Sequence, residues 1–303
     1  MKTKRTLTAS SLVLISTASL IAQDLSGDPA ATAGHLAFYR PLTLAPADAS
    51  DASGGATDEK EADAELVKKI LNPIADLTSV PFQNNWDFGI GPANAFKYTL
   101  NFQPVIPIEL NKDWNLISRT IVPIIYAQSP VQGGADHSGL GDIEQSFFFS
   151  PKQEVGGWIM GAGPVFLLPS ATESELGTGK WGAGPTAVVL QQRHGWTYGI
   201  LANQVWSYAG ADGRQNVNAT YLEPFLAYTV RKTFTTFYLN SESTYDWQAE
   251  QWSVPVNFMI TQLLKIKGQP VSFQLGYRYY ADGPKGGPDW GLRFQVNFVF
   301  PKK

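Results

Sequence analysis

Long segments in which apolar and polar residues alternate one by one are the feature that most constrains this fold. In "FKYTLNFQPVIPIEL" (96–110) the row that starts at Phe96 is apolar, whereas the other row includes Lys97 and Glu109. The closing segment "PDWGLRFQVNFVFPKK" (288–303) repeats this, with a large apolar row from Trp290 to Phe300 and a mostly polar row that contains Arg293. A period of two predicts β-strands with one apolar and one polar face.

About twelve such segments follow one another. We place them at 80–90, 96–110, 114–126, 140–150, 157–168, 180–190, 196–208, 218–229, 233–246, 252–263, 270–280 and 289–300. Their connections alternate between short ones, such as "NKD", and longer Gly-rich ones, such as "PSATESELGTG"; "GPANA" and "WQAEQ" are short where a long one is expected. Seven prolines inside the segments lack a ladder donor, so we expect bulges there, or fewer strands if they mark strand ends. Long loops on one rim and short turns on the other are typical of an outer-membrane barrel.

The apolar face decides between two all-β folds. In a soluble sandwich it points into a core, whereas in a membrane barrel it points to lipid and the polar face lines the lumen. The segments exceed the ~5–6 residues usual for soluble strands, and tryptophan gathers at both ends of them, as in interfacial aromatic belts. The predicted belt residues are Trp114, Trp158, Trp181, Trp196, Trp206, Trp252 and Trp290. We therefore predict an all-β, closed antiparallel transmembrane β-barrel of about twelve strands.

The polar rows supply the candidate pore-lining residues. These are Lys97, Glu109, Arg119, Asp142, Glu144, Glu223, Glu242, Arg278 and Arg293. With Asp87 and Asp246 added, the rows hold four positive and seven negative groups, a net charge of −3, which favours mild cation tolerance. Asp142 and Glu144 lie two apart, hence on one strand face, where they could bind a cation, act in acid–base chemistry or pair with a lumen arginine.

The N-terminal quarter of the chain has a different composition. Lys2, Lys4 and Arg5 precede an apolar stretch and a cleavage site after Ala22, so residues 1–22 read as a signal peptide. We expect residues 23–64 to be a disordered acidic linker because they are small, polar and acidic. Residues 65–79 carry apolar residues at helical spacing and predict an amphipathic helix, divided at Pro73, that could plug the barrel formed by 80–303.

Several classes of function find little support. The chain has no cysteine and a net charge of −3, which removes thiol chemistry and gives no footprint for nucleic acid. The three histidines, His35, His137 and His194, lie in expected loops or linkers rather than in mid-strand, where the Ser–His pair of a barrel-wall lipid hydrolase would need one. We expect no enzyme activity, no catalytic residue, no cofactor and no metal site.

Several stretches resemble a known family. "VPFQNNWDFGIGP", "GAGPVFLLPSAT", "GTGKWGAGP" and "GPDWGLRFQVNFVFPK" are similar to the Gram-negative outer-membrane proteins named for the MetA pathway of phenol degradation, often labelled transporter or neuromedin U. The resemblance covers about 65–303. It implies an outer-membrane barrel linked to uptake of aromatic compounds, and carries no site residues. The last strand also resembles the signal read by the barrel assembly machinery, with Phe300 as the terminal aromatic residue followed by "PKK".

The sequence thus predicts an exported porin-like barrel in the outer membrane of a Gram-negative bacterium. Its function would be that of a narrow channel or uptake protein for small molecules, aromatic or hydrophobic compounds among them. The expected partners are outer-membrane lipid, an unidentified small solute and, during insertion, the assembly machinery. The alternatives are a barrel-wall lipid hydrolase and a structural barrel whose lumen is filled.

Overall fold

The structure, a computed structural model, describes residues 52–301, with side chains from residue 60 onward. The predicted signal peptide and most of the predicted linker therefore lie outside the described residues. One long helix, α1 Ala52–Ile70, precedes the strands. None of the helices in the described part is long and apolar enough to cross a bilayer.

Fifteen β-strands pair into a single antiparallel sheet. They are β1 Thr78–Ile90, β2 Ala95–Phe102, β3 Val105–Glu109, β4 Trp114–Ala127, β5 His137–Leu140, β6 Ile143–Pro151, β7 Ile159–Leu168, β8 Lys180–Arg193, β9 Trp196–Gly210, β10 Asn218–Val230, β11 Thr235–Ser241, β12 Ser243–Asp246, β13 Gln251–Ile266, β14 Gln269–Asp282 and β15 Trp290–Phe300, with a short 3-10 turn, η1 Ser174–Leu176, between β7 and β8. β2 with β3, β5 with β6, and β11 with β12 are halves of single wall strands, so the wall has the predicted twelve strands.

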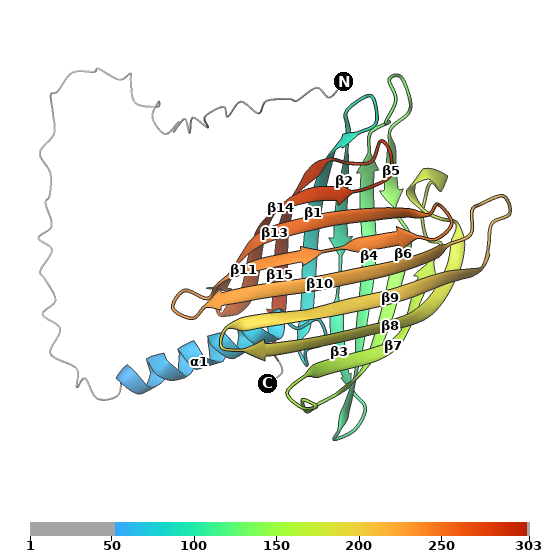
Figure 1. Cartoon of the computed structure of the whole chain (residues 1–303). Helices are drawn as coiled ribbons and strands as arrows, with labels where there is room; N and C mark the ends of the chain where they lie inside the picture. Colours follow the sequence, from blue (N-terminus) through green and yellow to red (C-terminus); the bar gives the residue numbers. More distant parts are fainter. Residues whose placement is uncertain (1–51, 302–303) are drawn as a thin grey trace, which may run out of the picture. The chain divides into compact units, whose positions relative to one another are not determined.

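The sheet closes on itself because the first and last strands pair. β1 runs antiparallel to β15 from Thr78, opposite Phe300, to Phe88, opposite Trp290. In a closed barrel every strand has two neighbours, so no row of backbone donors and acceptors is left at an edge. We call the end where β1 begins and β15 ends the terminal rim, and the other end the far rim (Figure 1).

Loop length differs between the rims as predicted. Two turns at the terminal rim have only two residues, His194–Gly195 and Lys267–Gly268, and all four have positive φ, as a type I′ hairpin turn requires. The far rim carries the two longest connections, 128–136 and 169–179, and also 211–217 and 283–289. The exceptions are the short far-rim turns 91–94 and 247–250 and the seven-residue connection 152–158 at the terminal rim. The two tight turns therefore fix the register of the strands that they join at the terminal rim. The longer far-rim loops do not constrain the strands in this way and can form a surface of their own.

The prolines distort the wall without changing the number of wall strands. Pro104 lies in the break between β2 and β3, and Pro255 lies at a register shift between β13 and β14. Pro164 and Pro185 face each other in otherwise paired strands. The missing N–H thus coincides with a break at Pro104 and a register shift at Pro255, whereas Pro164 and Pro185 stay in register, and none of these prolines ends a wall strand.

Helix α1 differs from the sequence prediction in its bounds. It begins at Ala52, inside the segment predicted to be disordered, and ends at Ile70 rather than continuing to 79. The early start has a physical reason: "DEKEADAELVKK" is rich in Ala, Glu and Lys, which favour helix even where hydrophobicity is low. The early end follows from Pro73, which cannot donate within a helix.

Candidate functional site in the barrel lumen

The inward-facing residues divide the lumen into a polar side and an apolar side. On β15 the odd row points inward, with Arg293 and Asn297 buried, and the even row points outward, with Leu292 and Phe298 exposed. The apolar side comes mainly from β4, β6, β8, β9 and β10. It consists of Ile117, Phe148, Val188, Leu190, Leu201 and Phe225.

An ion-pair network crosses the polar side. The Arg278 guanidinium donates to Asp87 Oδ1 at 3.0 Å and to Glu242 Oε2 at 3.1 Å. Arg293 donates to both oxygens of Glu242 at 2.7 Å, which is a bidentate contact. Asn85 Oδ1 accepts from both arginines. Arg278 and Arg293 are only 7% and 3% exposed, so both positive charges are buried. The carboxylates of Asp87 and Glu242 compensate them.

A second charged group lies along β4, β6 and β10. Arg119 Nη2 donates to Gln103 Oε1 at 3.3 Å, and within the described residues it forms no ion pair shorter than 4.0 Å. Glu223 accepts from Asn240 at 2.8 Å and from the Tyr221 hydroxyl at 3.0 Å. The Glu223 carboxylate is therefore hydrogen-bonded by neutral donors, and the Arg119 guanidinium acts on it and on Glu144 through charge, without a direct ion pair.

Residues 71–77, which we call the plug segment, enter the barrel from the terminal rim. Ile74 is 4% exposed and belongs to the apolar cluster that contains Ile117 and Phe148. A Cβ added at Gly161 of β7 would lie 3.1 Å from Ile74 Cδ1, so the glycine leaves the room that Ile74 needs. The plug segment thus fills the apolar side of the lumen near the terminal mouth.

Helix α1 is held at the same rim by apolar and polar contacts. Leu66 and Val67 pack with Leu77 of the plug segment and with Leu263 of β13 and Val299 of β15. Gln192 Nε2 donates to the carbonyl of Lys68 at 2.9 Å, and Lys265 pairs with Asp63 at 2.8 Å. These partners come from different parts of the wall, so the C-terminal part of α1 lies at the terminal mouth, whereas its N-terminal part projects away from the barrel (Figure 1).

A cavity of about 190 Å³ lies between the plug segment and the charged groups. Its polar lining includes Arg119, Glu223, Glu242 and Arg293, together with amides such as Gln103 and Asn240. Its apolar lining includes Val105, Leu201, Phe225 and Tyr238. Residues 69–73 cover it from the terminal side. The lumen therefore holds an amphipathic compartment closed at one end by the N-terminal segment.

Seven of the nine predicted pore-lining residues lie on inward rows within the barrel. They are Lys97, Arg119, Glu144, Glu223, Glu242, Arg278 and Arg293. Lys97 stands opposite Asp87 on the neighbouring strand. Glu144 accepts from Ser146 at 3.5 Å.

The other two predicted pore-lining residues lie at the rims. Glu109, at the terminal rim, pairs with Lys152 at 2.6 Å and is well exposed. Asp142 lies between β5 and β6 and accepts from the Ala171 amide and from the amide and hydroxyl of Thr178. It thus holds the far-rim loop 169–179, so the expected Asp142–Glu144 pair is not a shared site. Asp246, also counted for the lumen, caps the turn at 248–249.

These rim positions change the charge of the lumen. Four acids remain inside, Asp87, Glu144, Glu223 and Glu242, beside the four cations Lys97, Arg119, Arg278 and Arg293. Among the predicted wall residues the net luminal charge is therefore zero instead of −3, and Lys69 of α1 adds a positive group to the cavity lining. The alternation of apolar and polar residues shows on which face of a strand a residue lies, but not how close it is to the end of that strand. The sequence prediction therefore counted Glu109, Asp142 and Asp246 as luminal although they lie at the rims.

The predicted aromatic belt residues point outward at the strand ends. Trp114, Trp158 and Trp196 lie at the terminal rim, and Trp181, Trp206, Trp252 and Trp290 lie at the far rim. Six are exposed, and Trp252 is half-buried against Tyr245. Asn85, Tyr221 and Tyr238 were not predicted as site residues. An uncharged polar side chain on an alternating strand looks like any other inward residue in the sequence, and its role becomes visible only when its hydrogen-bond partners or the cavity it lines are known.

The two histidines of the described residues lie at opposite rims of the barrel. His137 is in strand β5 rather than in a loop, and its Nδ1 lies 2.6 Å from Glu173 Oε2. The Glu173 pKa lies below its ordinary value because of this hydrogen bond, so the carboxylate is ionised at neutral pH. His194 occupies a turn at the terminal rim. Within residues 60–301, no serine hydroxyl is hydrogen-bonded to either ring.

Comparison with solved structures defines the class of fold. The outer membrane channel COG4313 from Pseudomonas putida F1 superposes with a TM-score of 0.58 at 13% identity, over 74% of this chain and 94% of that chain. The NanC porin gives 0.46 at 10% identity, over 74% and 100%. Outer membrane phospholipase A from Escherichia coli gives 0.40 at 11%, over 80% and 98%. The chain thus has the fold of an outer-membrane-type β-barrel.

No protein-family model matches the sequence, and neither does any curated protein. The resemblance to the phenol-degradation family therefore rests on the quoted sequence stretches alone.

Proposed function

We propose that this protein is an outer-membrane barrel that conducts small solutes through a narrow lumen whose terminal mouth is closed by the plug segment. The observation that carries the proposal is the cavity of about 190 Å³ inside the barrel, lined by charged and amide side chains and covered by residues 69–73. Arg119 lines this cavity and, within the described residues, its guanidinium gives one hydrogen bond, to Gln103 Oε1, so further donors are left to meet a solute.

The outer surface supports a location in lipid. The outward rows are apolar, and tryptophans stand at the ends of strands on both rims. Most wall strands exceed the ~9–11 residues that cross a bilayer at a tilt. The C-terminal strand, which pairs with β1, suits recognition by the barrel assembly machinery during export to a Gram-negative outer membrane.

The cavity favours small amphipathic solutes. Leu201 and Phe225 offer an apolar side, and Arg119 with Gln103 offers a polar end. A volume near that of the ~150 Å³ engineered cavity known to hold benzene suits one aromatic ring. Together with the sequence resemblance, this makes small aromatic compounds the first solutes to test. Because the luminal charges balance, selectivity between cations and anions should be weak.

Single-channel conductance in planar bilayers tests the proposal. The full chain should show a low or rarely open conductance, and deletion of residues 23–77 should raise it severalfold because the terminal mouth is then uncovered. The deletion leaves Thr78, the first paired residue of β1, in place. Heat-modifiable gel migration confirms that the variant folds. A folded deletion variant with no conductance would contradict the channel proposal and favour a structural barrel with a filled lumen.

A further inference from the structure

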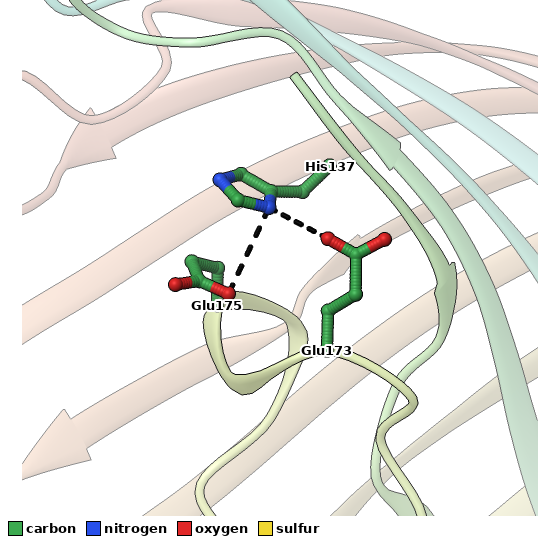
Figure 2. A group of neighbouring side chains, drawn as sticks. All are labelled: His137, Glu173 and Glu175. Carbon is green, nitrogen blue, oxygen red and sulfur yellow. Dashed lines mark hydrogen bonds and ion pairs between the residues drawn. The ribbon is translucent and has the colours of Figure 1, made fainter. Parts of the chain in front are cut away.

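We propose that the far rim binds a divalent transition-metal ion through His137, Glu173 and Glu175. His137 Nδ1 lies 2.6 Å from Glu173 Oε2 and 3.7 Å from Glu175 Oε2. One ligand atom from each residue lies within 4.8 Å of the other two. Figure 2 shows the ring of His137 and both carboxylates turned toward one common point. This inference is independent of the proposed conduction.

The spacing suits a small ion with mixed nitrogen and oxygen ligands. Zn²⁺ binds imidazole nitrogen at ~2.0–2.1 Å and carboxylate oxygen at ~2.0–2.2 Å, and a tetrahedral site leaves one position for water. In this geometry two ligand atoms of the same ion are roughly 3–3.5 Å apart. That separation lies between the distances from His137 Nδ1 to Glu173 Oε2, 2.6 Å, and to Glu175 Oε2, 3.7 Å. Binding replaces the direct His137–Glu173 hydrogen bond, and small rotations of the side chains are sufficient.

The three ligands come from two elements that are already fastened to each other. His137 begins β5, and Glu173 and Glu175 lie in the far-rim loop 169–179. Glu173 Oε1 accepts from the Ser138 amide at 3.2 Å, and Thr172 exchanges hydrogen bonds with Leu140. The site therefore needs little ordering when an ion arrives.

The far end of the same loop is anchored as well. Asp142 accepts from Thr178 at 2.6 and 2.7 Å. Arg214 from the loop between β9 and β10 donates to the carbonyls of Thr178 and Ser174, at 3.1 and 2.7 Å, and to that of Gly177. The hydrogen bonds of the arginine go to carbonyl groups and leave the Glu173 and Glu175 carboxylate oxygens free of it, although its charge also acts on Glu175. Glu175 Oε2 accepts from the Ser174 hydroxyl at 2.8 Å, a bond that a metal ion would share or replace.

Exposure and charge favour an exchangeable metal. The side chains are 29%, 39% and 53% exposed, so one side of the group is open to water. An imidazole that accepts a metal is neutral, which leaves two carboxylates to balance a doubly charged ion. The nitrogen ligand favours Zn²⁺, Ni²⁺ or Co²⁺ over Ca²⁺ and Mg²⁺, which prefer oxygen alone. A bound ion would join β5 to the loop 169–179.

Isothermal titration calorimetry of Zn²⁺ into the full-length protein, purified in detergent without a histidine tag, tests the site. We expect one ion per chain, and binding weakened at least tenfold in His137→Ala and in Glu173→Gln. The double variant His35→Ala/His194→Ala is the matched control, because it retains His137 as the chain's single histidine, and it should bind as the wild type does.

Three results would overturn the proposal. They are no saturable Zn²⁺ binding by the wild type, equal binding by His137→Ala, and Ca²⁺ binding as tight as Zn²⁺ binding. Heat-modifiable migration confirms that each variant is folded. If His137→Ala does not fold, Glu173→Gln and Glu175→Gln decide the matter, since both retain side chains of the same size and should both lose affinity.

Discussion

Glu242 is the residue on which the luminal network depends most. It joins β11 to β12, and its two oxygens receive Arg278 and Arg293 from β14 and β15. Removing its charge leaves two nearly buried guanidinium groups with Asp87 as their remaining carboxylate partner in the network. Loss of one partner in a buried pair is far more destabilising than loss of an exposed ion pair.

We therefore predict that Glu242→Gln lowers the free energy of unfolding by about 3 kcal/mol, the lower end of the usual range because Glu242 is partly exposed. Urea unfolding of the protein refolded into lipid vesicles measures this. Glu65→Gln, which removes an exposed pair with Lys68, serves as control and should change stability by less than about 1 kcal/mol. Equal effects of the two substitutions would show that the network contributes no more than a surface pair.

At the residue scale, alternation predicts which face a side chain takes and little more. It assigned Glu242, Arg278 and Arg293 to the lumen, where they lie. It could not place Glu109 and Asp142 at the rims, because that depends on where pairing stops. The group of His137, Glu173 and Glu175 was also out of reach, since Glu173 is 36 residues from His137 and only the docking of the loop 169–179 against β5 brings them together.

Among the elements, the plug segment is held in the lumen by few large side chains. Ile74 and Leu77 are its buried large apolar residues, and Leu66 and Val67 of α1 pack beside Leu77. Ordering the backbone of the segment opposes docking, so the polar contacts of α1 with Gln192 and Lys265 also help to keep it in place.

Ile74 offers the most specific test at this scale. Ile74→Asp places a charge in the apolar cluster around Phe148, so we predict that the plug segment leaves the lumen and that mean conductance rises severalfold. Ile74→Val keeps the site apolar and should behave as the wild type. Bilayer recordings of both variants decide this; unchanged conductance of Ile74→Asp would mean that Ile74 does not obstruct the path.

Sequence analysis found the N-terminal element but not its bounds. The spacing of Leu66, Ile70, Ile74 and Leu77 predicted one helix divided at Pro73, and the helix indeed ends before that proline. Ile74 and Leu77 then enter the lumen without helical structure. The spacing of apolar residues cannot distinguish a helix that continues to Leu77 from a helix followed by a non-helical segment. Apolar side chains are stabilised by burial inside the barrel whatever the backbone conformation.

At the scale of the whole molecule, the barrel was predictable because the same alternation of apolar and polar residues recurs in all twelve wall strands. Each wall strand shows the period of two, and an even number of strands returns the chain to its starting rim, where β15 pairs with β1. The luminal charge balance was not predictable in the same way. It depends on three acids at strand ends, whose partners are set by loops.

The central claim is that helix α1 and the plug segment together close the terminal mouth of a conducting barrel. Because the chain has no cysteine, two can be introduced cleanly in place of the ion-paired Asp63 and Lys265. A short bis-maleimide would then fasten α1 to β13. Treatment of the cysteine-free wild type with the same reagent controls for non-specific effects.

Single-channel recording of the Asp63→Cys/Lys265→Cys variant before and after cross-linking is the most direct measurement. The uncross-linked variant should show openings and cross-linking should abolish them, while the treated wild type should be unaffected. Openings of unchanged size and frequency after complete cross-linking would contradict it, since the path for ions would then bypass the segment assigned as its closure.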